Sequence, residues 1–171
     1  MKIEQIGGII IAICCIFLAI RSINKQFDKE TLLSKWGRST HGEVVKKNSN
    51  GIMLEYFVEG KNYETILSSP LDCVIGERFM IKYYIANPNI CEVLVTKPVF
   101  LENEIVDTTF GNIIRIETKN KELVFYYFVD TLKLYKTIKY SIKDTQNIRY
   151  NKNYNVIYSP KTPQRAIINI K

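Results

Sequence analysis

The sequence predicts a mostly β protein in which an N-terminal transmembrane helix precedes two tandem, small, five-stranded β-barrel or sandwich modules. Three observations support this fold class: an uncharged apolar run near the N-terminus, a repeated strand pattern, and abundant branched and aromatic residues. The chain has 11 Tyr and 8 Phe among its 171 residues, and such side chains favour strands. Apolar residues make up 46% and charged residues 24% of the chain, which is a globular composition and not a disordered one.

The apolar run covers residues 5–20, which carry no charged side chain. It is shorter than the roughly 20 residues that cross a bilayer, but flanking residues extend it, and Arg21 and Lys25 can reach the interface. We therefore expect the chain to contact the lipid bilayer through residues 5–23. A cleaved signal peptide is the alternative, yet no small-x-small cleavage site follows the run.

Basic residues near the ends of the run predict its orientation. Five Lys or Arg lie between positions 21 and 38, whereas only Lys2 precedes the run. Because basic loops stay on the cytoplasmic side, we expect a single-pass membrane protein with its C-terminal domain in the cytoplasm.

A short amphipathic segment follows the run. Apolar residues at helical spacing predict that a helix continues over residues 24–36 and ends at Gly37. Trp36 then lies either at the lipid head groups or, as we expect, against the first β module.

The rest of the chain contains two similar stretches. Gly42 matches Gly111, Val44-Val45 matches Ile113-Ile114, Tyr63 matches Tyr135, Tyr83 matches Tyr158, and Pro88 matches Pro163. Duplication of one module explains these matches, and chance similarity between two strand-rich stretches is the alternative.

Each stretch reads as about five strands. In the first, Ile52, Leu54, Tyr56 and Val58 alternate with more polar residues, the period of a half-buried strand, and a turn follows at Glu59-Gly60-Lys61. The predicted organisation is a membrane anchor over 1–24, a juxtamembrane helix or linker over 25–40, β module 1 over 41–100, a connector over 101–110, and β module 2 over 111–171.

These turn and strand residues resemble an uncharacterised family of bacterial membrane-anchored β domains. The first copy matches the family pattern at Gly42, Val44, Tyr56, Gly60, Tyr63, Gly76 and Tyr83, and the second at Tyr158, Pro160 and Pro163. The sequence departs from the pattern at Ile85, where a Pro is expected, and the second copy lacks counterparts of Gly60 and Gly76. The resemblance implies a small barrel or sandwich after membrane helices and, with the single apolar run, a place in the bacterial inner (cytoplasmic) membrane. It implies no activity.

Catalytic and metal-binding patterns are missing from the sequence. His41 is the only histidine, and together with Cys73 and Cys91 it has no metal-ligand spacing. The two cysteines would form a disulfide in an exported domain, but a cytoplasmic orientation favours small buried hydrophobic residues. We place His41 in an exposed loop and Glu55, Glu59, Glu64 and Glu77 on solvent faces, and we expect no enzymatic activity and no cofactor.

Positive charge is concentrated in the second copy, where residues 111–171 hold 12 Lys or Arg against 4 Asp or Glu. The leading hypothesis is a non-enzymatic, membrane-tethered binding or scaffold protein whose partner is another protein, such as a membrane subunit or a toxin neutralised at the membrane. Exposed strand edges favour such docking. The alternative is an electrostatic binder of anionic lipid head groups or single-stranded nucleic acid, of which nucleic acid is the less favoured. The predicted partner surface comprises Tyr126, Tyr135, Lys136, Lys139, Tyr140, Arg149 and Tyr150.

Overall fold

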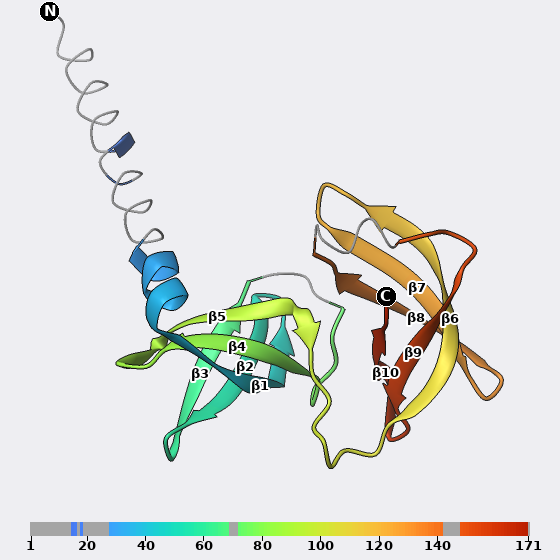
Figure 1. Cartoon of the computed structure of the whole chain (residues 1–171), viewed down its shortest axis with the longest axis horizontal. Coiled ribbons are helices and arrows are strands. Elements are labelled where there is room, and N and C mark those ends of the chain that lie inside the picture. The colour runs from blue at the N-terminus through green and yellow to red at the C-terminus, as the bar shows by residue number, and fades with distance from the viewer. Residues whose placement is uncertain (1–14, 17, 19–27, 69–71, 142–147, 171) are drawn as a thin grey trace, which may run out of the picture.

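The computed structural model describes residues 15–16, 18, 28–68, 72–141 and 148–170. The protein is mostly β and contains two five-stranded antiparallel sheets that lie side by side (Figure 1). The strands are β1 (Gly37–Asn48), β2 (Gly51–Val58), β3 (Lys61–Leu67), β4 (Arg78–Tyr84), β5 (Asn87–Pro98), β6 (Asp107–Glu117), β7 (Glu122–Val129), β8 (Leu132–Lys139), β9 (Asn153–Ser159) and β10 (Thr162–Ile168).

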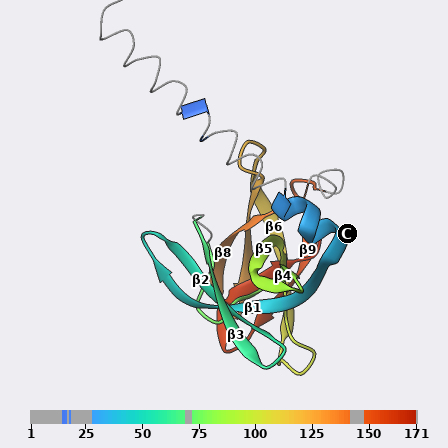
Figure 2. The ribbon, with the colours of Figure 1, turned by 90° about the vertical axis from the view of Figure 1, so that its left-hand side faces the viewer.

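Both sheets have the same strand order. Module 1 runs β3-β2-β1-β4-β5, and module 2 runs β8-β7-β6-β9-β10, so the first strand of each module is central. In each sheet the two outermost strands also approach each other, β3 towards β5 and β8 towards β10, which curls the sheet towards a barrel. The view along the line joining the modules shows module 1 in front of module 2 (Figure 2).

The alternating pattern of β2 positions its side chains as predicted. Ile52, Leu54, Tyr56 and Val58 are all buried, because successive side chains of a strand point to opposite faces of the sheet. In β7 the equivalent residues Leu123, Phe125 and Tyr127 are buried as well.

A β-bulge interrupts the central strand at the same place in both modules. In β1 the register shifts between Val44 and Lys46, so Val45 is the extra residue. In β6 it shifts between Ile113 and Arg115, so Ile114 is the extra residue. A bulge increases the local twist of a sheet and here helps each sheet to curl.

In each module, the hydroxyl group of a buried tyrosine donates a hydrogen bond to the backbone carbonyl of a proline. Tyr56 donates a hydrogen bond of 2.7 Å to the Pro88 carbonyl oxygen, and Tyr127 donates one of 2.5 Å to that of Pro163. Each tyrosine lies opposite a buried glycine, Gly42 or Gly111, in the register. The two modules therefore repeat one pattern at the level of single contacts.

One of the predicted matches is wrong by one residue. Tyr63 lies opposite Tyr56, whereas the residue opposite Tyr127 is Leu134, and Tyr135 lies opposite Tyr126. Leu134 is thus the counterpart of Tyr63, and Tyr135 is the counterpart of Glu64.

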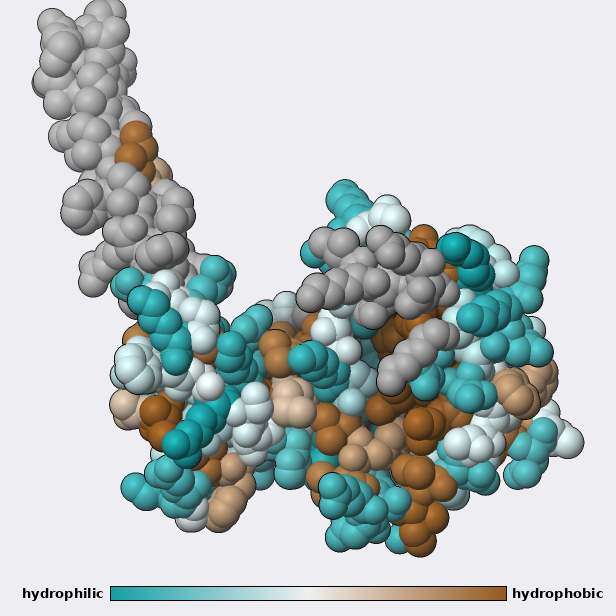
Figure 3. Space-filling model, in the orientation of Figure 1, coloured by the Kyte–Doolittle hydropathy of each residue, from teal (hydrophilic) through white to brown (hydrophobic). Residues whose placement is uncertain are grey.

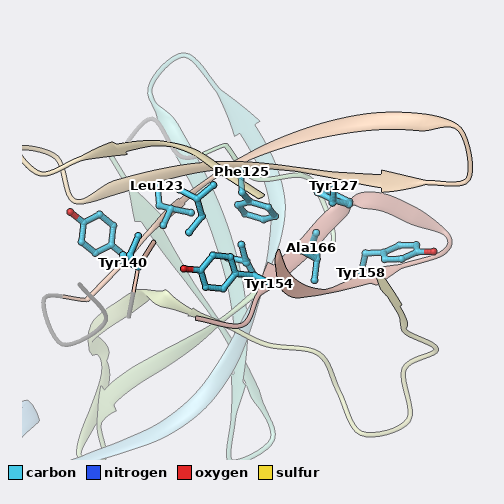
Figure 4. Packing of buried hydrophobic residues seen from close by; sticks show 11 residues of the cluster. Leu123, Phe125, Tyr127, Tyr140, Tyr154, Tyr158 and Ala166 are labelled. Carbon is cyan, nitrogen blue, oxygen red and sulfur yellow. The ribbon is translucent and has the colours of Figure 1, made fainter. Parts of the chain in front are cut away.

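Each module has its own apolar core. In module 2, Leu123, Phe125 and Tyr127 of β7 face Tyr154 of β9 and Ala166 of β10 (Figure 4). In module 1 the buried residues divide into two clusters, and Cys73 belongs to one and Cys91 to the other. Both of these cysteines are buried and free, which agrees with small hydrophobic residues and not with a disulfide between them.

Two sets of polar contacts join the modules. Lys136 of β8 forms a buried ion pair with Glu77 of module 1, with Nζ to Oε2 at 2.8 Å, and Thr137 N–H donates to the Asp72 carboxylate at 3.1 Å. In the connector, Glu104 forms ion pairs with both Arg78 of β4 and Arg165 of β10.

The module boundaries differ from the predicted ones. β1 begins at Gly37, so the linker predicted to extend to residue 40 ends at residue 36, and His41 lies exposed in a strand and not in a loop. β6 begins at Asp107, so the last residues of the predicted 101–110 connector are already strand. Ile105 and Val106 expose apolar side chains in this connector. The connector runs along the lower edge of the molecule in Figure 1, and Figure 3, in the same orientation, shows hydrophobic side chains at that edge.

A short helix over residues 28–36 leads directly into β1. Leu33 is 3% exposed, but Trp36 is 63% exposed, so the predicted packing of Trp36 on module 1 is wrong. Among the residues that the structure describes, no helix is both long and apolar enough to cross a membrane. The predicted anchor lies outside them except for positions 15, 16 and 18, which are helical and exposed.

Candidate binding face

Only two of the seven predicted partner-surface residues come together. Tyr126 and Tyr135 lie directly opposite each other on β7 and β8. Lys136 and Tyr140 are buried, each at 3% exposure, and so are not surface residues. Lys136 belongs to the inner face of β8, because it lies opposite the buried Phe125.

The remaining three predicted residues lie elsewhere. Lys139 is partly buried and forms an ion pair with Glu122 at 2.7 Å. Arg149 and Tyr150 are exposed in the segment before β9, where the Arg149 N–H donates to the Tyr154 hydroxyl at 2.6 Å. The predicted basic cluster therefore does not form.

An aromatic face replaces that cluster. We define it as Tyr126 and Phe128 of β7 together with Lys133 and Tyr135 of β8. The rings of Tyr126 and Phe128 meet edge to face with centroids 5.8 Å apart, and those of Tyr126 and Tyr135 are 6.4 Å apart. Phe128 and Tyr135 are 45% and 57% exposed, so substantial ring surface faces water.

Lys133 lies over these rings. Its Nζ is 4.0 Å from the Tyr126 centroid and 5.5 Å from that of Tyr135, which is within the range of cation–π attraction. The ammonium and the rings thus hold one another in place. Phe128 was missed as a site residue, although its spacing of two from Tyr126 places both side chains on the same face of a strand.

The aromatic face continues onto the central strand of module 2. Asn112 lies opposite Tyr126, and Phe110, two residues earlier on the same face, is 64% exposed. The bulge residue Ile114 is 47% exposed. The outer face of β6, β7 and β8 therefore presents apolar side chains that the core does not use.

The equivalent face of module 1 carries different chemistry. Glu55 and Glu64 occupy the positions of Tyr126 and Tyr135, and they too lie directly opposite each other. Beside Glu55 is an open hollow of about 570 Å³. Its lining includes Thr40, His41, Glu43, Val45, Phe57 and Asn62.

Glu77 departs from its predicted position on a solvent face. It is 3% exposed, and besides Lys136 it accepts a hydrogen bond of 3.1 Å from the Val74 N–H. Two causes raise the pKa of the Cys73 thiol: its burial, which is the larger one, and the nearby Glu77 carboxylate. The raised pKa keeps this thiol protonated and disfavours a nucleophilic role. Within the described part of the chain, no group of three His, Cys, Asp or Glu residues is arranged to hold a metal ion.

Comparison of this chain with protein-family models, curated proteins and solved structures finds no match. The class of protein is therefore defined by the fold itself: two five-stranded β modules of one pattern, joined by ion pairs, with an aromatic outer face on the second.

Proposed function

We propose that this chain is a non-enzymatic binding protein, tethered to the bacterial inner membrane, whose aromatic face docks onto another polypeptide. The observation that carries the proposal is the aromatic face itself. Phe128 and Tyr135 are about half exposed on a rigid two-strand platform, and neither ring belongs to the buried cluster of module 2.

Exposed aromatic residues on a rigid sheet suit a binding site for two reasons. Tyr and Phe bury a large area when a partner covers them. Because their side chains have few rotatable bonds, they lose little conformational entropy when they become fixed in an interface. β8 is also the edge strand of its sheet, and such an edge can pair with an added strand. The C-terminal half of β8 already contacts module 1 through Thr137, so residues Leu132–Tyr135 of β8 remain for a partner.

Residues 5–23 provide the tether in this proposal. Its support is their uncharged apolar composition and the helix over 28–36, which runs without a break into β1. The excess of basic residues after the run favours a cytoplasmic position for both modules. The resemblance to membrane-anchored bacterial β domains agrees with this arrangement and adds no activity.

Site-specific photo-crosslinking in native membranes tests the proposal. The chain should stay in the membrane pellet after an alkaline carbonate wash. A photoreactive residue at Tyr135 should then crosslink to a polypeptide, whereas one at the exposed turn residue Lys119 should not. Tyr126→Ala should reduce the crosslink at least ~10-fold, because truncating an aromatic interface anchor commonly costs about 2 kcal/mol or more. Equal crosslinking from both positions would contradict the proposal.

Single-stranded nucleic acid is a second candidate because Lys133 lies over partly exposed aromatic rings, and bases stack on such rings beside basic side chains. Two of the predicted basic residues are instead engaged in ion pairs, Lys136 with Glu77 and Lys139 with Glu122. Retention on oligonucleotides at low salt that falls steeply with added salt would favour this candidate over a protein partner.

A further inference from the structure

Two glutamates face each other on the outer face of module 1. Glu55 of β2 and Glu64 of β3 are directly opposite in the register, and both are exposed. Like charges at such positions destabilise a sheet. Among the ion pairs of the described residues, neither carboxylate has a cationic partner, so a cation brought by a ligand would relieve their repulsion.

A hollow lies beside this acidic pair. Glu55 and Phe57 form part of its wall together with His41. Glu43 and Arg78 also line the hollow, but they are paired with each other, so together they add little free charge. The site thus combines an unpaired double negative charge with a partly apolar recess of about 570 Å³.

Module 2 presents the complementary surface at the equivalent positions. Phe110 replaces His41, Ile114 replaces Val45, and Tyr126 replaces Glu55. Larger apolar side chains therefore stand where module 1 is hollowed. Lys133, over the rings of Tyr126 and Tyr135, provides the cation.

We propose that the aromatic face of one copy of this chain docks onto the acidic pair and hollow of module 1 of a second copy, with Lys133 placed at Glu55 and Glu64. The inference rests on the proposed function, because it uses the same aromatic face and names its partner.

The docking joins two molecules and not the two modules of one chain. Lys136 points from the inner face of β8 towards Glu77 of its own module 1. Its neighbour Tyr135 points the opposite way, because successive side chains of a strand alternate. The aromatic face is thus turned away from the module to which its own strand is bound.

Such a contact is head to tail, because it joins two different surfaces. The docked pair of copies keeps one free acidic pair, on the first copy, and one free aromatic face, on the second, so the association continues into a row or closes into a ring. Tethering to one membrane would raise the effective concentration of the faces.

Charge reversal in the full-length chain in its native membrane tests this inference. With a photoreactive residue at Tyr135, the expected product has twice the 19.9 kDa mass of the chain. Reversing the charge on one side, either by Lys133→Glu or by Glu55→Lys together with Glu64→Lys, should reduce this product at least ~10-fold, because like charges would then face each other. Combining the two reversals should restore it to within ~3-fold of the original yield, which also shows that the variants fold.

A control reversal, Glu92→Lys on β5, should leave the product unchanged. The outcomes separate the two proposals. Crosslinking of Tyr135 to a different polypeptide only would overturn self-association and keep the binding face. Absence of any crosslinked polypeptide would overturn both. A self-crosslink that survives reversal on one side, or is not restored by reversal on both sides, would overturn the pairing of Lys133 with the acidic pair.

Discussion

At the scale of single residues, the buried ion pair between Glu77 and Lys136 is the largest departure from expectation. Their side chains are 5% and 3% exposed, although Lys and Glu are rarely buried unless paired. Both oxygens of Glu77 lie near Lys136 Nζ, at 3.0 and 2.8 Å. Two-point contact and burial make each residue dependent on the other.

Removing the lysine alone should be strongly destabilising. Lys136→Met leaves the Glu77 carboxylate without its cation, and breaking a buried pair in this way costs about 3–5 kcal/mol of unfolding free energy. The control variant Lys119→Met, at an exposed turn residue before β7, should change that free energy by less than about 0.5 kcal/mol. Urea unfolding measures both, and equal effects would contradict this assignment. Adding Glu77→Gln to Lys136→Met should recover much of the loss, because no uncompensated charge then remains.

The sequence could not identify this pair for a definable reason. Net charge and clustering place Lys136 with Lys139 and Arg149, but only the alternation of β8 decides which side chains point inward. Lys136 lies opposite Phe125, and that register is not readable from a single strand. Tyr126 and Tyr135 lie opposite each other because their strands form one hairpin.

At the scale of elements, the central strand of each module contains a buried glycine three residues before the bulge residue. A Cβ on Gly111 would lie 2.7 Å from both the Tyr126 carbonyl oxygen and Val156 Cγ2. A Cβ on Gly42 would meet chiefly the end of the Ile81 side chain, and it would lie 3.2 Å from the nearest backbone oxygen, that of Glu55. The two equivalent glycines thus have neighbours of different flexibility.

We expect Gly111→Ala to destabilise the protein more than Gly42→Ala. A side-chain end can rotate away, whereas a ladder carbonyl cannot move without distorting the sheet, so costs of about 3 and about 1 kcal/mol are reasonable within the range for overpacking. Unfolding midpoints of the two variants provide the comparison. Val156→Ala should rescue Gly111→Ala only in part, since the Tyr126 carbonyl stays. Full rescue would show that the backbone contact is unimportant.

Strand content and alternation were predictable at this scale, but element ends were not. β2 follows its period-2 pattern because one face packs on the core. The match of Tyr63 with Tyr135 failed by one residue because both are tyrosines near a turn, and residue identity alone cannot fix register. Trp36 failed for a related reason: helical spacing predicts a face, but not what covers it.

At the scale of the whole molecule, Glu104 joins both modules through Arg78 and Arg165. Burial alone would raise the pKa of this carboxyl group. The hydrogen bond from Arg165, the Leu101 N–H and the two guanidinium charges outweigh it, so the pKa of Glu104 is lowered below its ordinary 4.5. A lowered pKa in the folded state means that the ionised form stabilises folding above the ordinary value, and that this stabilisation is lost as pH falls through the lowered one.

Glu104→Gln should therefore destabilise the chain at pH 7, and progressively less as the pH is lowered from 4.5 towards 3. The difference in unfolding free energy between the variant and the parent, measured by urea titration across this range, should shrink as the pH falls below about 4.5. A difference that stays constant from pH 7 to pH 3 would contradict the role of the Glu104 charge.

The contacts between modules lay beyond sequence analysis, since they join residues far apart in the chain. Glu77 and Lys136 are 59 positions apart, and Glu104 and Arg165 are 61 apart. Two modules and a connector were predictable because each module repeats its own local pattern. How one module binds the other depends on single charged residues that differ between the two copies.

The separation of Glu77 from Lys136 also sets an order of events during translation. The ribosome releases β4 well before β8, and domains generally fold in the order in which they emerge. While the later half is still in the exit tunnel, the carboxylate of the nascent first half must keep its hydration shell. The two halves therefore cannot form this ion pair until the ribosome has added Lys136 to the chain.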